Sequence, residues 1–184
     1  MPHLVMLRHG QSQWNLENRF TGWVDVDITE AGEAEARKAG AALAKLEIDA
    51  VFTSELNRAI RTAILALEAA EEAGADLSRI KEGGNLAMIR DEALNERDYG
   101  DLAGLNKAET AEKYGDAQVH EWRRSYATRP PGGESLADVV DRVRPYYETH
   151  IQPLLAAGKT VLVAAHGNSL RALHIVLGLN TPDD

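Results

Sequence analysis

Short apolar runs alternate with longer stretches of helical periodicity along this chain. The runs have the length of buried strands, and the alternation is typical of β-α-β units that build a parallel sheet. We therefore predict strands at residues 3–7, 49–53, 86–89 and 160–165. We predict helices at residues 30–46, 56–73, 107–113, 116–126, 135–156 and 169–177.

This order of elements predicts an α/β fold, a three-layer α/β/α sandwich with a mostly parallel sheet. The two short helices between residues 107 and 126 form a helical insertion. Nothing in the composition marks a second domain, so we expect one domain over residues 1–184. The polar loop at residues 9–28 is long for a compact fold, which favours a functional role for it.

Capping signals refine the predicted helices. Thr29 is placed to cap the first helix, and Ser135 with Asp138 resembles a capping box at the start of the long helix. Pro145 should bend that long helix because it lacks an amide proton. The periodicity assigns to the inner face of the first helix Ala31, Ala34, Leu43 and Leu46.

Composition narrows the possible functions. The chain has 184 residues, 44% of them hydrophobic, which is enough for one buried core. It has no cysteine, which excludes disulfides, thiolate metal sites and a cysteine nucleophile. A net charge of −9 argues against nucleic acid as a partner. No apolar run approaches the ~18–20 residues of a membrane span, and no secretory signal opens the chain, so we expect a cytoplasmic protein.

Two His-Gly pairs follow predicted strands. Arg8-His9-Gly10 follows the first strand, and Ala165-His166-Gly167 follows the last. Ligands of open α/β sheets bind at the carboxyl ends of strands, so we expect both imidazoles at one edge. A neutral imidazole is nucleophilic near neutral pH, and arginine binds two phosphate oxygens with its planar fork. The pattern favours phosphoryl transfer through a phosphohistidine, with a small anionic substrate.

Other polar side chains extend this hypothesis around the two histidines. Ser12 and Asn15 lie in the loop after His9 and can donate hydrogen bonds to phosphate oxygens. His166 is expected to donate to the transferring phosphoryl group, with Asn168 as a further donor. A lone histidine after a strand is more often structural, but the neighbouring arginine and the second His-Gly pair favour catalysis.

Cations from three further segments are candidates for binding anionic groups. Arg58 and Arg61 lie three residues apart on one helix face, and we expect Arg58 at the site and Arg61 on the surface. Lys107 and the pair Arg123 and Arg124 are candidates for a second anionic group. Adjacent helical residues point in different directions, so both arginines reach one ligand only at a helix end or in a shared cleft.

Transfer to a hydroxyl needs a proton carrier, and Glu96 is the candidate because it lies in a polar loop beside Tyr99. An alternative stays open, in which Glu96 is a loop carboxylate paired with Arg97. The six histidines show no i, i+4 pair, so we expect a reaction without a metal ion.

Longer motifs in this sequence resemble those of a known family. The segments, in this order, are residues 8–15 (RHGQSQWN), 20–23 (FTGW), 95–100 (NERDYG), 104–110 (GLNKAET), 122–124 (WRR) and 165–171 (AHGNSLR). In order and spacing they resemble the histidine phosphatase superfamily and, within it, the 2,3-bisphosphoglycerate-dependent phosphoglycerate mutases. The likeness covers nearly the whole chain.

The resemblance implies an isomerase of glycolysis and gluconeogenesis that interconverts 2- and 3-phosphoglycerate, with 2,3-bisphosphoglycerate as priming phosphoryl donor. It implies that His9 is phosphorylated, that Arg8, Arg58 and His166 form the phosphate pocket, and that Glu96 carries the proton. The residues it implies for the rest of the substrate are Ser12, Asn15, Thr21, Gly22, Tyr99, Lys107, Arg123, Arg124, Gly167 and Asn168. Family members are commonly dimers or tetramers, so a homodimer or homotetramer is expected.

One departure from the family concerns the carboxyl end. Family members continue past the helix that ends near Gly178 with a further strand and a tail, so either this protein is short or the sequence omits that region. If the region is truly absent, we expect an edge strand to be missing and the pocket to be less shielded. Water would then compete for the phosphohistidine and shift the activity from mutase towards phosphatase. Two alternatives stay open: a phosphatase of the same superfamily acting on a small phosphorylated metabolite, and a non-catalytic module that binds a phosphorylated ligand.

Overall fold

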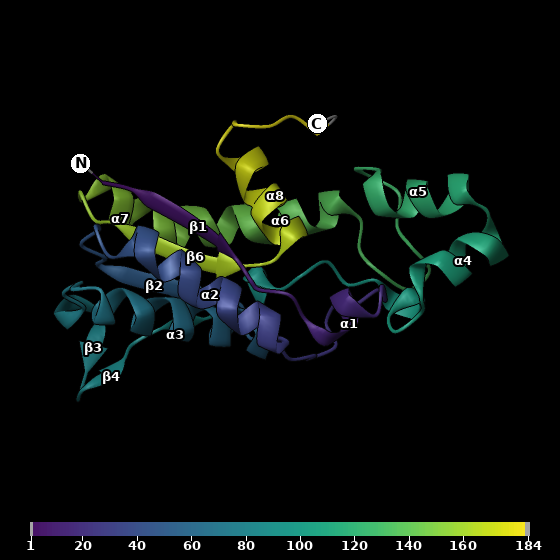
Figure 1. Ribbon diagram of the computed structural model, residues 1–184. Coiled ribbons are helices and arrows are strands. Elements are labelled where there is room, and N and C mark those ends of the chain that lie inside the picture. The colour runs from purple at the N-terminus through teal and green to yellow at the C-terminus, as the bar shows by residue number, and fades with distance from the viewer. Residues whose placement is uncertain (1, 183–184) are drawn as a thin grey trace.

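A parallel four-stranded sheet forms the centre of the computed structural model, which describes residues 2–182 (Figure 1). Its strand order is β1–β6–β2–β5, and every neighbouring pair is parallel. The strands are β1 (Leu4–Arg8), β6 (Val161–Ala165), β2 (Ala50–Thr53) and β5 (Ile89–Arg90). The mostly parallel sheet predicted from the sequence is therefore confirmed.

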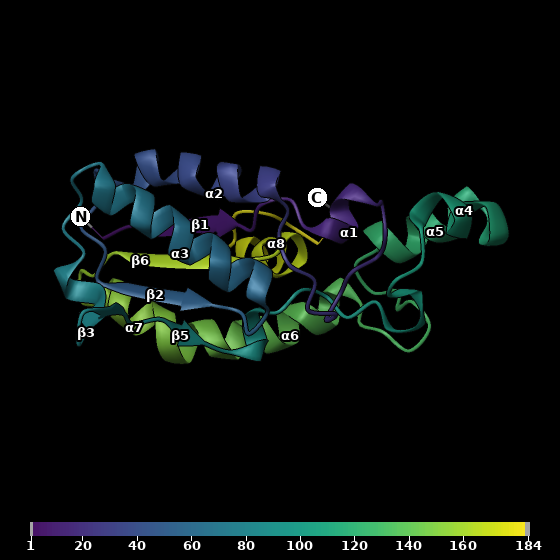
Figure 2. The same cartoon turned by 60° about the horizontal axis from the view of Figure 1, so that its bottom comes forward.

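Helices cover both faces of this sheet. On one face lie α2 (Glu30–Leu43) and α3 (Asn57–Glu72), and on the other α6 (Leu136–Tyr146), α7 (Gln152–Ala156) and α8 (Gly167–Val176) (Figure 2). Successive side chains of a strand point to opposite faces. Accordingly Leu162 packs in the core under α2 and α3, whereas Val161 and Val163 pack under α6 and α8. The predicted three-layer sandwich is confirmed.

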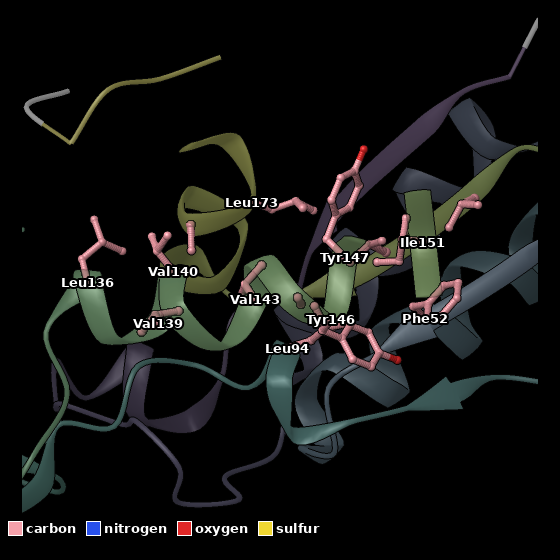
Figure 3. Close-up of a cluster of buried hydrophobic side chains, with 14 residues drawn as sticks. Phe52, Leu94, Leu136, Val139, Val140, Val143, Tyr146, Tyr147, Ile151 and Leu173 are labelled. Carbon is pink, nitrogen blue, oxygen red and sulfur yellow. The ribbon is translucent and has the colours of Figure 1, made fainter. Parts of the chain in front are cut away.

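Each face of the sheet has its own hydrophobic core, and the larger of these two lies between the sheet and α6. Val139, Val140 and Val143 of α6 belong to one buried cluster with Phe52 of β2 and Leu173 of α8 (Figure 3). Because β6 is buried on both faces, its sequence is an uninterrupted apolar run without polar alternation.

The predicted insertion lies beyond the carboxyl ends of the strands (Figure 1). It comprises α4 (Lys107–Tyr114) and α5 (Asp116–Arg124), and the short α1 (Gln13–Leu16) lies on the same side of the sheet. A third small core holds it together, made of Phe20, Leu102, Val119 and Trp122.

The predicted caps are present. The Thr29 hydroxyl accepts from the Gly32 N–H at 3.2 Å. The Ser135 hydroxyl accepts from the Asp138 N–H at 3.1 Å, and the Asp138 carboxylate accepts from the Ser135 N–H at 2.8 Å. These side chains satisfy backbone donors that the first turn of each helix leaves without a partner.

The single strand predicted at residues 86–89 is wrong, because the segment divides between two sheets. β4 (Asn85–Leu86) pairs antiparallel with β3 (Lys81–Glu82), and only β5 joins the main sheet. Both residues of the Gly83-Gly84 turn have positive φ, at 58° and 85°, as a two-residue hairpin turn requires. The glycine pair therefore marks a hairpin.

The helix predicted at residues 135–156, with a bend at Pro145, is divided into two helices in the structure. α6 ends at Tyr146, a π-helical turn follows at Tyr147–Ile151, and α7 completes the segment. Pro145 and Pro153, each without an amide proton, lie on either side of this turn, so regular helical hydrogen bonding is interrupted there.

The predicted inner face of α2 is only partly right. Leu43 is buried, and Leu46 lies just beyond the helix and packs partly buried, but Ala31 and Ala34 are exposed. The buried positions of α2 are Gly32, Ala36, Gly40 and Leu43. A pattern that counts only apolar side chains overlooks glycines, which form much of this contact face.

Two results concern the limits of the described chain. Among residues 2–182, the helices are too short or too polar for any of them to span a bilayer. The last two residues, Asp183 and Asp184, lie outside the described residues, and so does the expectation of a missing strand after them.

Close packing of α2 on α3 predicts the effect of filling the space at Gly40. A Cβ there would lie 2.5 Å from the Ala66 carbonyl oxygen and 2.6 Å from the Ala69 Cβ. Gly40→Ala should therefore lower the free energy of unfolding by about 1–3 kcal/mol, although alanine is the better helix former. Urea unfolding measures this change. The control Ala41→Leu enlarges the exposed neighbour and should stay within about 0.5 kcal/mol; equal or greater stability of Gly40→Ala would contradict the close contact.

Candidate active site

The two predicted histidines follow neighbouring strands at the same edge of the sheet. His9 follows β1 and His166 follows β6, and the last residues of these strands, Arg8 and Ala165, are paired. The His9 N–H donates to the Ala165 carbonyl at 3.1 Å. The centroids of the two imidazole rings are 5.0 Å apart. The rings therefore converge, as strand ends in a parallel sheet predict.

A cavity of about 290 Å³ is lined by His9 and lies at this edge. Its lining carries one carboxylate, that of Glu96, and seven cations. The cations are Arg8, Arg19, Arg58, Lys107, Arg123, Arg124 and Arg171. The whole chain has a net charge of −9, so positive charge is concentrated here against the overall balance. The cavity suits a small ligand with several negative charges.

Nearly all the residues predicted for the site line this cavity. They are Arg8, His9, Asn15, Thr21, Gly22, Arg58, Glu96, Tyr99, Lys107, Arg123, Arg124, Gly167 and Asn168. His166 is not among the lining residues and is fully buried, with its ring against that of His9. Ser12 does not line the cavity either. Its hydroxyl accepts from the Asn15 N–H at 3.1 Å, which caps α1 and shapes the loop.

Burial and one hydrogen bond define the state of His9. Its Nδ1 lies 2.6 Å from the Gly10 carbonyl oxygen, which can only accept, so Nδ1 carries the proton and Nε2 keeps the lone pair. Desolvation by burial, with the charges of Arg58 and Arg8, lowers the pKa of His9 to about 4, although the hydrogen bond to Gly10 opposes this shift. At neutral pH the ring is therefore uncharged with a free nitrogen, as a nucleophile requires.

Helix α3 holds the peptide that orients His9. The Gly10 N–H donates to the Thr62 hydroxyl at 3.1 Å, and this hydroxyl donates to the Arg58 carbonyl at 2.6 Å. Thr62 is fully buried and does not line the cavity. Sequence reasoning missed it, because a threonine inside a helix gives no catalytic signal until its partner is known.

His166 is held by a hydroxyl on the neighbouring strand end. Its Nε2 lies 2.7 Å from the Ser54 hydroxyl oxygen, and its Nδ1 has no hydrogen-bond partner among the residues described. Desolvation by burial, followed by the charge of Arg58, keeps the pKa of His166 well below its usual value. His166 is therefore also neutral.

Arg58 and Arg61 separate as predicted. Arg58 is 1% exposed and donates to the Gly22 carbonyl at 2.6 Å and to the Val24 carbonyl at 2.8 Å. Burial lowers the pKa of Arg58, but a guanidinium stays charged, so a fixed positive charge lines the cavity. Arg61 instead forms partly exposed ion pairs with Asp27 and Glu33.

The insertion supplies three of the seven cations that line the cavity. Lys107 is the first residue of α4, and Arg123 and Arg124 are the last two residues of α5. Their place at a helix end lets both arginines reach the cavity although they are adjacent. Burial, with the nearby Arg123, lowers the pKa of Lys107. A bound anion would relieve this crowding of positive charge.

The Glu96 carboxylate contacts the start of α8. Its Oε1 accepts from the N–H of Arg97 at 2.7 Å and of Asn168 at 3.2 Å. The Glu96 carbonyl accepts from Trp23 at 2.7 Å and from Arg142 at 3.0 Å, which fixes the loop. The fully buried Arg97 guanidinium donates instead to a carbonyl of α5. Within residues 2–182 the geometry favours a carboxylate directed at the cavity over a Glu96–Arg97 ion pair.

Three lining residues were missed: Arg19, Phe20 and Arg171. Arg171 lies four residues after Gly167, so the two share a face of α8. The predicted start of this helix at residue 169 hid that relation, since α8 begins at Gly167. Among residues 2–182 no group of three histidine or carboxylate side chains is arranged to hold a metal ion.

The fold and the paired imidazoles define a class of protein. A family model, the histidine phosphatase superfamily (branch 1), matches residues 4–182. The chain belongs to this superfamily.

Relatives in the same superfamily carry more specific names. The chain is 54% identical over 208 residues to the 2,3-bisphosphoglycerate-dependent phosphoglycerate mutase of Caulobacter vibrioides, covering all of this chain and 83% of the relative. It is 58% identical over 176 residues to the protein of the same name from Methylobacterium radiotolerans, covering 95% and 78%. The solved structure of a mycobacterial glucosyl-3-phosphoglycerate phosphatase with VO3 has a TM-score of 0.81 and 30% identity, covering 100% of this chain and 85% of that one.

The burial of His9 predicts how it titrates. Its folded pKa of about 4 lies below the ordinary value of 6.5, so the ring should remain mostly neutral at about pH 5. Because the unfolded chain binds this proton more readily, the contribution of His9 to stability falls as the pH drops from 6.5 towards 4. NMR titration of histidine-labelled protein measures the midpoint, and the signal lost in His9→Gln assigns it. A midpoint at 6.5 or above would contradict the burial argument.

Proposed function

We propose that this protein is a 2,3-bisphosphoglycerate-dependent phosphoglycerate mutase, which interconverts 2- and 3-phosphoglycerate through a phosphohistidine at His9. The observation that carries the proposal is the neutral His9 ring, 5.0 Å from a second neutral imidazole, in a cavity with seven cations and one carboxylate. The names of the relatives with 54–58% identity support the same reaction.

The chemistry of phosphoryl transfer assigns a role to each group at the sheet edge. His9 attacks phosphorus with its free Nε2, while Arg8 and Arg58 bind the phosphoryl oxygens. His166 donates a hydrogen bond to the same oxygens as negative charge spreads over them. A fixed guanidinium needs no reorganisation during the reaction, so the buried Arg58 is well suited to this role.

The rest of the substrate is assigned to the insertion and to the start of α8. Phosphoglycerates carry a carboxylate besides the phosphate, and Lys107, Arg123 and Arg124 supply three cations on one wall. Asn15, Thr21, Gly22, Tyr99, Gly167 and Asn168 line the space between, and Ser12 acts by shaping the loop. A mutase must hold the bisphosphorylated intermediate by its carboxylate while the second phosphate is presented to the free His9, and the cations of the insertion serve that need.

Glu96 is proposed as the proton carrier. Its Oε1 already accepts two backbone hydrogen bonds, and it is the one carboxylate among the described lining residues. It takes the proton from the attacking hydroxyl and returns it in the reverse direction.

The lining fits 2,3-bisphosphoglycerate as priming donor. Two phosphates and a carboxylate need an excess of cations, which the seven basic side chains provide. The Nδ1 of His166, buried and without a partner among the described residues, offers a further hydrogen-bonding position. When bound, the bisphosphate supplies the phosphoryl group that His9 accepts.

A phosphatase is the second candidate, and one observation favours it. The glucosyl-3-phosphoglycerate phosphatase structure shares the fold of this chain with a TM-score of 0.81. Such an enzyme would use the same phosphohistidine with water as acceptor. The ratio of mutase turnover to release of inorganic phosphate from phosphoglycerate distinguishes the two activities.

Incubation with labelled 2,3-bisphosphoglycerate tests the proposal directly. We expect one acid-labile phosphoryl group per chain, mapped to His9 by mass spectrometry, and mutase turnover well above phosphate release. His9→Ala should lose the label and at least about 10³-fold in kcat. His3→Ala, which changes an exposed histidine outside the cavity, is the control and should behave as wild type. Absence of label, or label on another residue, would refute the proposed function.

The role of Glu96 makes a separate prediction. Glu96→Gln keeps the shape of the side chain but removes its capacity to accept a proton, so kcat should fall by about 10²-fold with little change in KM. The control Glu92→Gln changes an exposed carboxylate of the same loop and should have no effect. Steady-state kinetics of both variants decide this assignment; normal turnover of Glu96→Gln would remove Glu96 from proton transfer.

A further inference from the structure

Ser54 is a buried hydroxyl that the reaction scheme has not used. It follows Thr53, the last residue of β2, which is paired with Ala164 of β6. Ser54 is fully buried and does not line the cavity. Its Oγ lies 2.7 Å from the His166 Nε2. Parallel pairing thus brings the ends of β2 and β6 to one point, where a hydroxyl meets an imidazole.

Counting hydrogen bonds at Ser54 determines which atom donates. The Leu56 N–H donates to the Ser54 Oγ at 3.2 Å, so one acceptor position of the oxygen is occupied. The single hydroxyl proton has one acceptor within reach among the described residues, the His166 Nε2. If Nε2 carried a proton, Oγ would receive two donors and its own proton would be buried without an acceptor, which is unfavourable. The hydroxyl therefore donates to Nε2.

This direction of donation determines where the proton of the neutral His166 ring lies. With Nε2 accepting, Nδ1 must carry the proton. Nδ1 makes no hydrogen bond within residues 2–182, although the His166 side chain caps the start of α8 near the Ser169 N–H, and the ring lies against that of His9. Burial, followed by the charge of Arg58, holds the pKa of His166 well below its usual value, so the ring is neutral and its one proton is on either Nδ1 or Nε2.

We propose that Ser54 is a positioning residue that holds His166 in the Nδ1–H tautomer, ready to donate to an oxygen of the transferring phosphoryl group. The catalytic part of this inference rests on the proposed function. The two imidazoles then share one tautomer but use opposite nitrogens: His9 keeps Nδ1–H on the Gly10 carbonyl and attacks with Nε2, whereas His166 accepts at Nε2 and donates with Nδ1–H. Without Ser54, His166 can turn a lone pair toward an anionic oxygen, which repels it.

Nitrogen-15 NMR of the histidine rings tests the tautomer, because protonated and bare ring nitrogens have different shifts. In the unliganded wild-type protein we expect His166 to be protonated at Nδ1 and bare at Nε2, with its signals assigned by their loss in His166→Gln. In Ser54→Ala we expect the His166 signals to move towards an average of both tautomers, while those of His9 keep the wild-type pattern. A wild-type His166 protonated at Nε2 would overturn the proposal.

Kinetics test whether the tautomer matters to the reaction. Ser54→Ala should lower kcat and the rate of His9 phosphorylation by about 10-fold or more, with KM changed little, because substrate binding does not involve Ser54. Ser135→Ala removes another buried serine hydroxyl outside the cavity and controls for a general loss of stability. Ser54→Ala with an unmoved His166 tautomer, or with undiminished phosphorylation, would overturn the proposal.

The two measurements separate this inference from the proposed function. If wild-type protein takes no label from 2,3-bisphosphoglycerate, the proposed function fails, but the ring tautomer remains measurable in the unliganded protein. If Ser54→Ala does not fold, the wild-type spectrum alone still confirms or overturns the direction of the Ser54–His166 hydrogen bond.

Discussion

The pairing of β6 between β1 and β2 is the constraint on which the rest of the site depends. Its register sets Ala165 opposite Arg8 and Ala164 opposite Thr53, so three chain segments leave the sheet at one place. The residues that follow are His9, His166 and Ser54. Parallel strand pairing thus brings together residues that are more than 150 positions apart in the sequence, since residue 9 meets residue 166, and these three are the residues for which we propose the roles of nucleophile, donor and positioning residue. Burial of β6 on both faces keeps this register from slipping, because every side chain of the strand is in a core.

The charge at this edge of the sheet is positive, whereas the net charge of the whole chain is −9. Burial makes both imidazoles neutral, and it leaves the guanidinium of Arg58 charged but removed from water. Neutral rings beside fixed cations suit an anionic substrate better than charged rings would, because only a neutral imidazole can attack phosphorus. Among the described residues that line the cavity, Glu96 is the one acidic side chain, so the other carboxylates lie outside it.

Much of this arrangement could be predicted from the sequence, and the failures have physical causes. The meeting of His9 and His166 could be predicted, because each follows an apolar run that ends in a polar loop. The end of such a run fixes the end of the strand and so the place of the residue after it. The hairpin at residues 81–86 was missed because local hydrogen bonding, not the hydrophobic pattern, decides it. Pro145 indicated a bend in the long helix but not the π-helical turn that follows Tyr146. Ser54 and Thr62 were missed for another reason: a hydroxyl has no visible chemistry in a sequence until the register shows its partner.

The three cores divide the cavity walls between two parts of the molecule. The sandwich cores fix the imidazoles and Arg58, whereas Lys107 and the paired arginines of α5 are carried by the insertion around Phe20 and Trp122. Mutations in the insertion can therefore reshape the wall that meets the organic portion of a ligand while leaving the bond-breaking machinery intact. Such a division allows related chains to diverge in substrate range over evolutionary time, because the insertion can change while the residues at the sheet edge are kept.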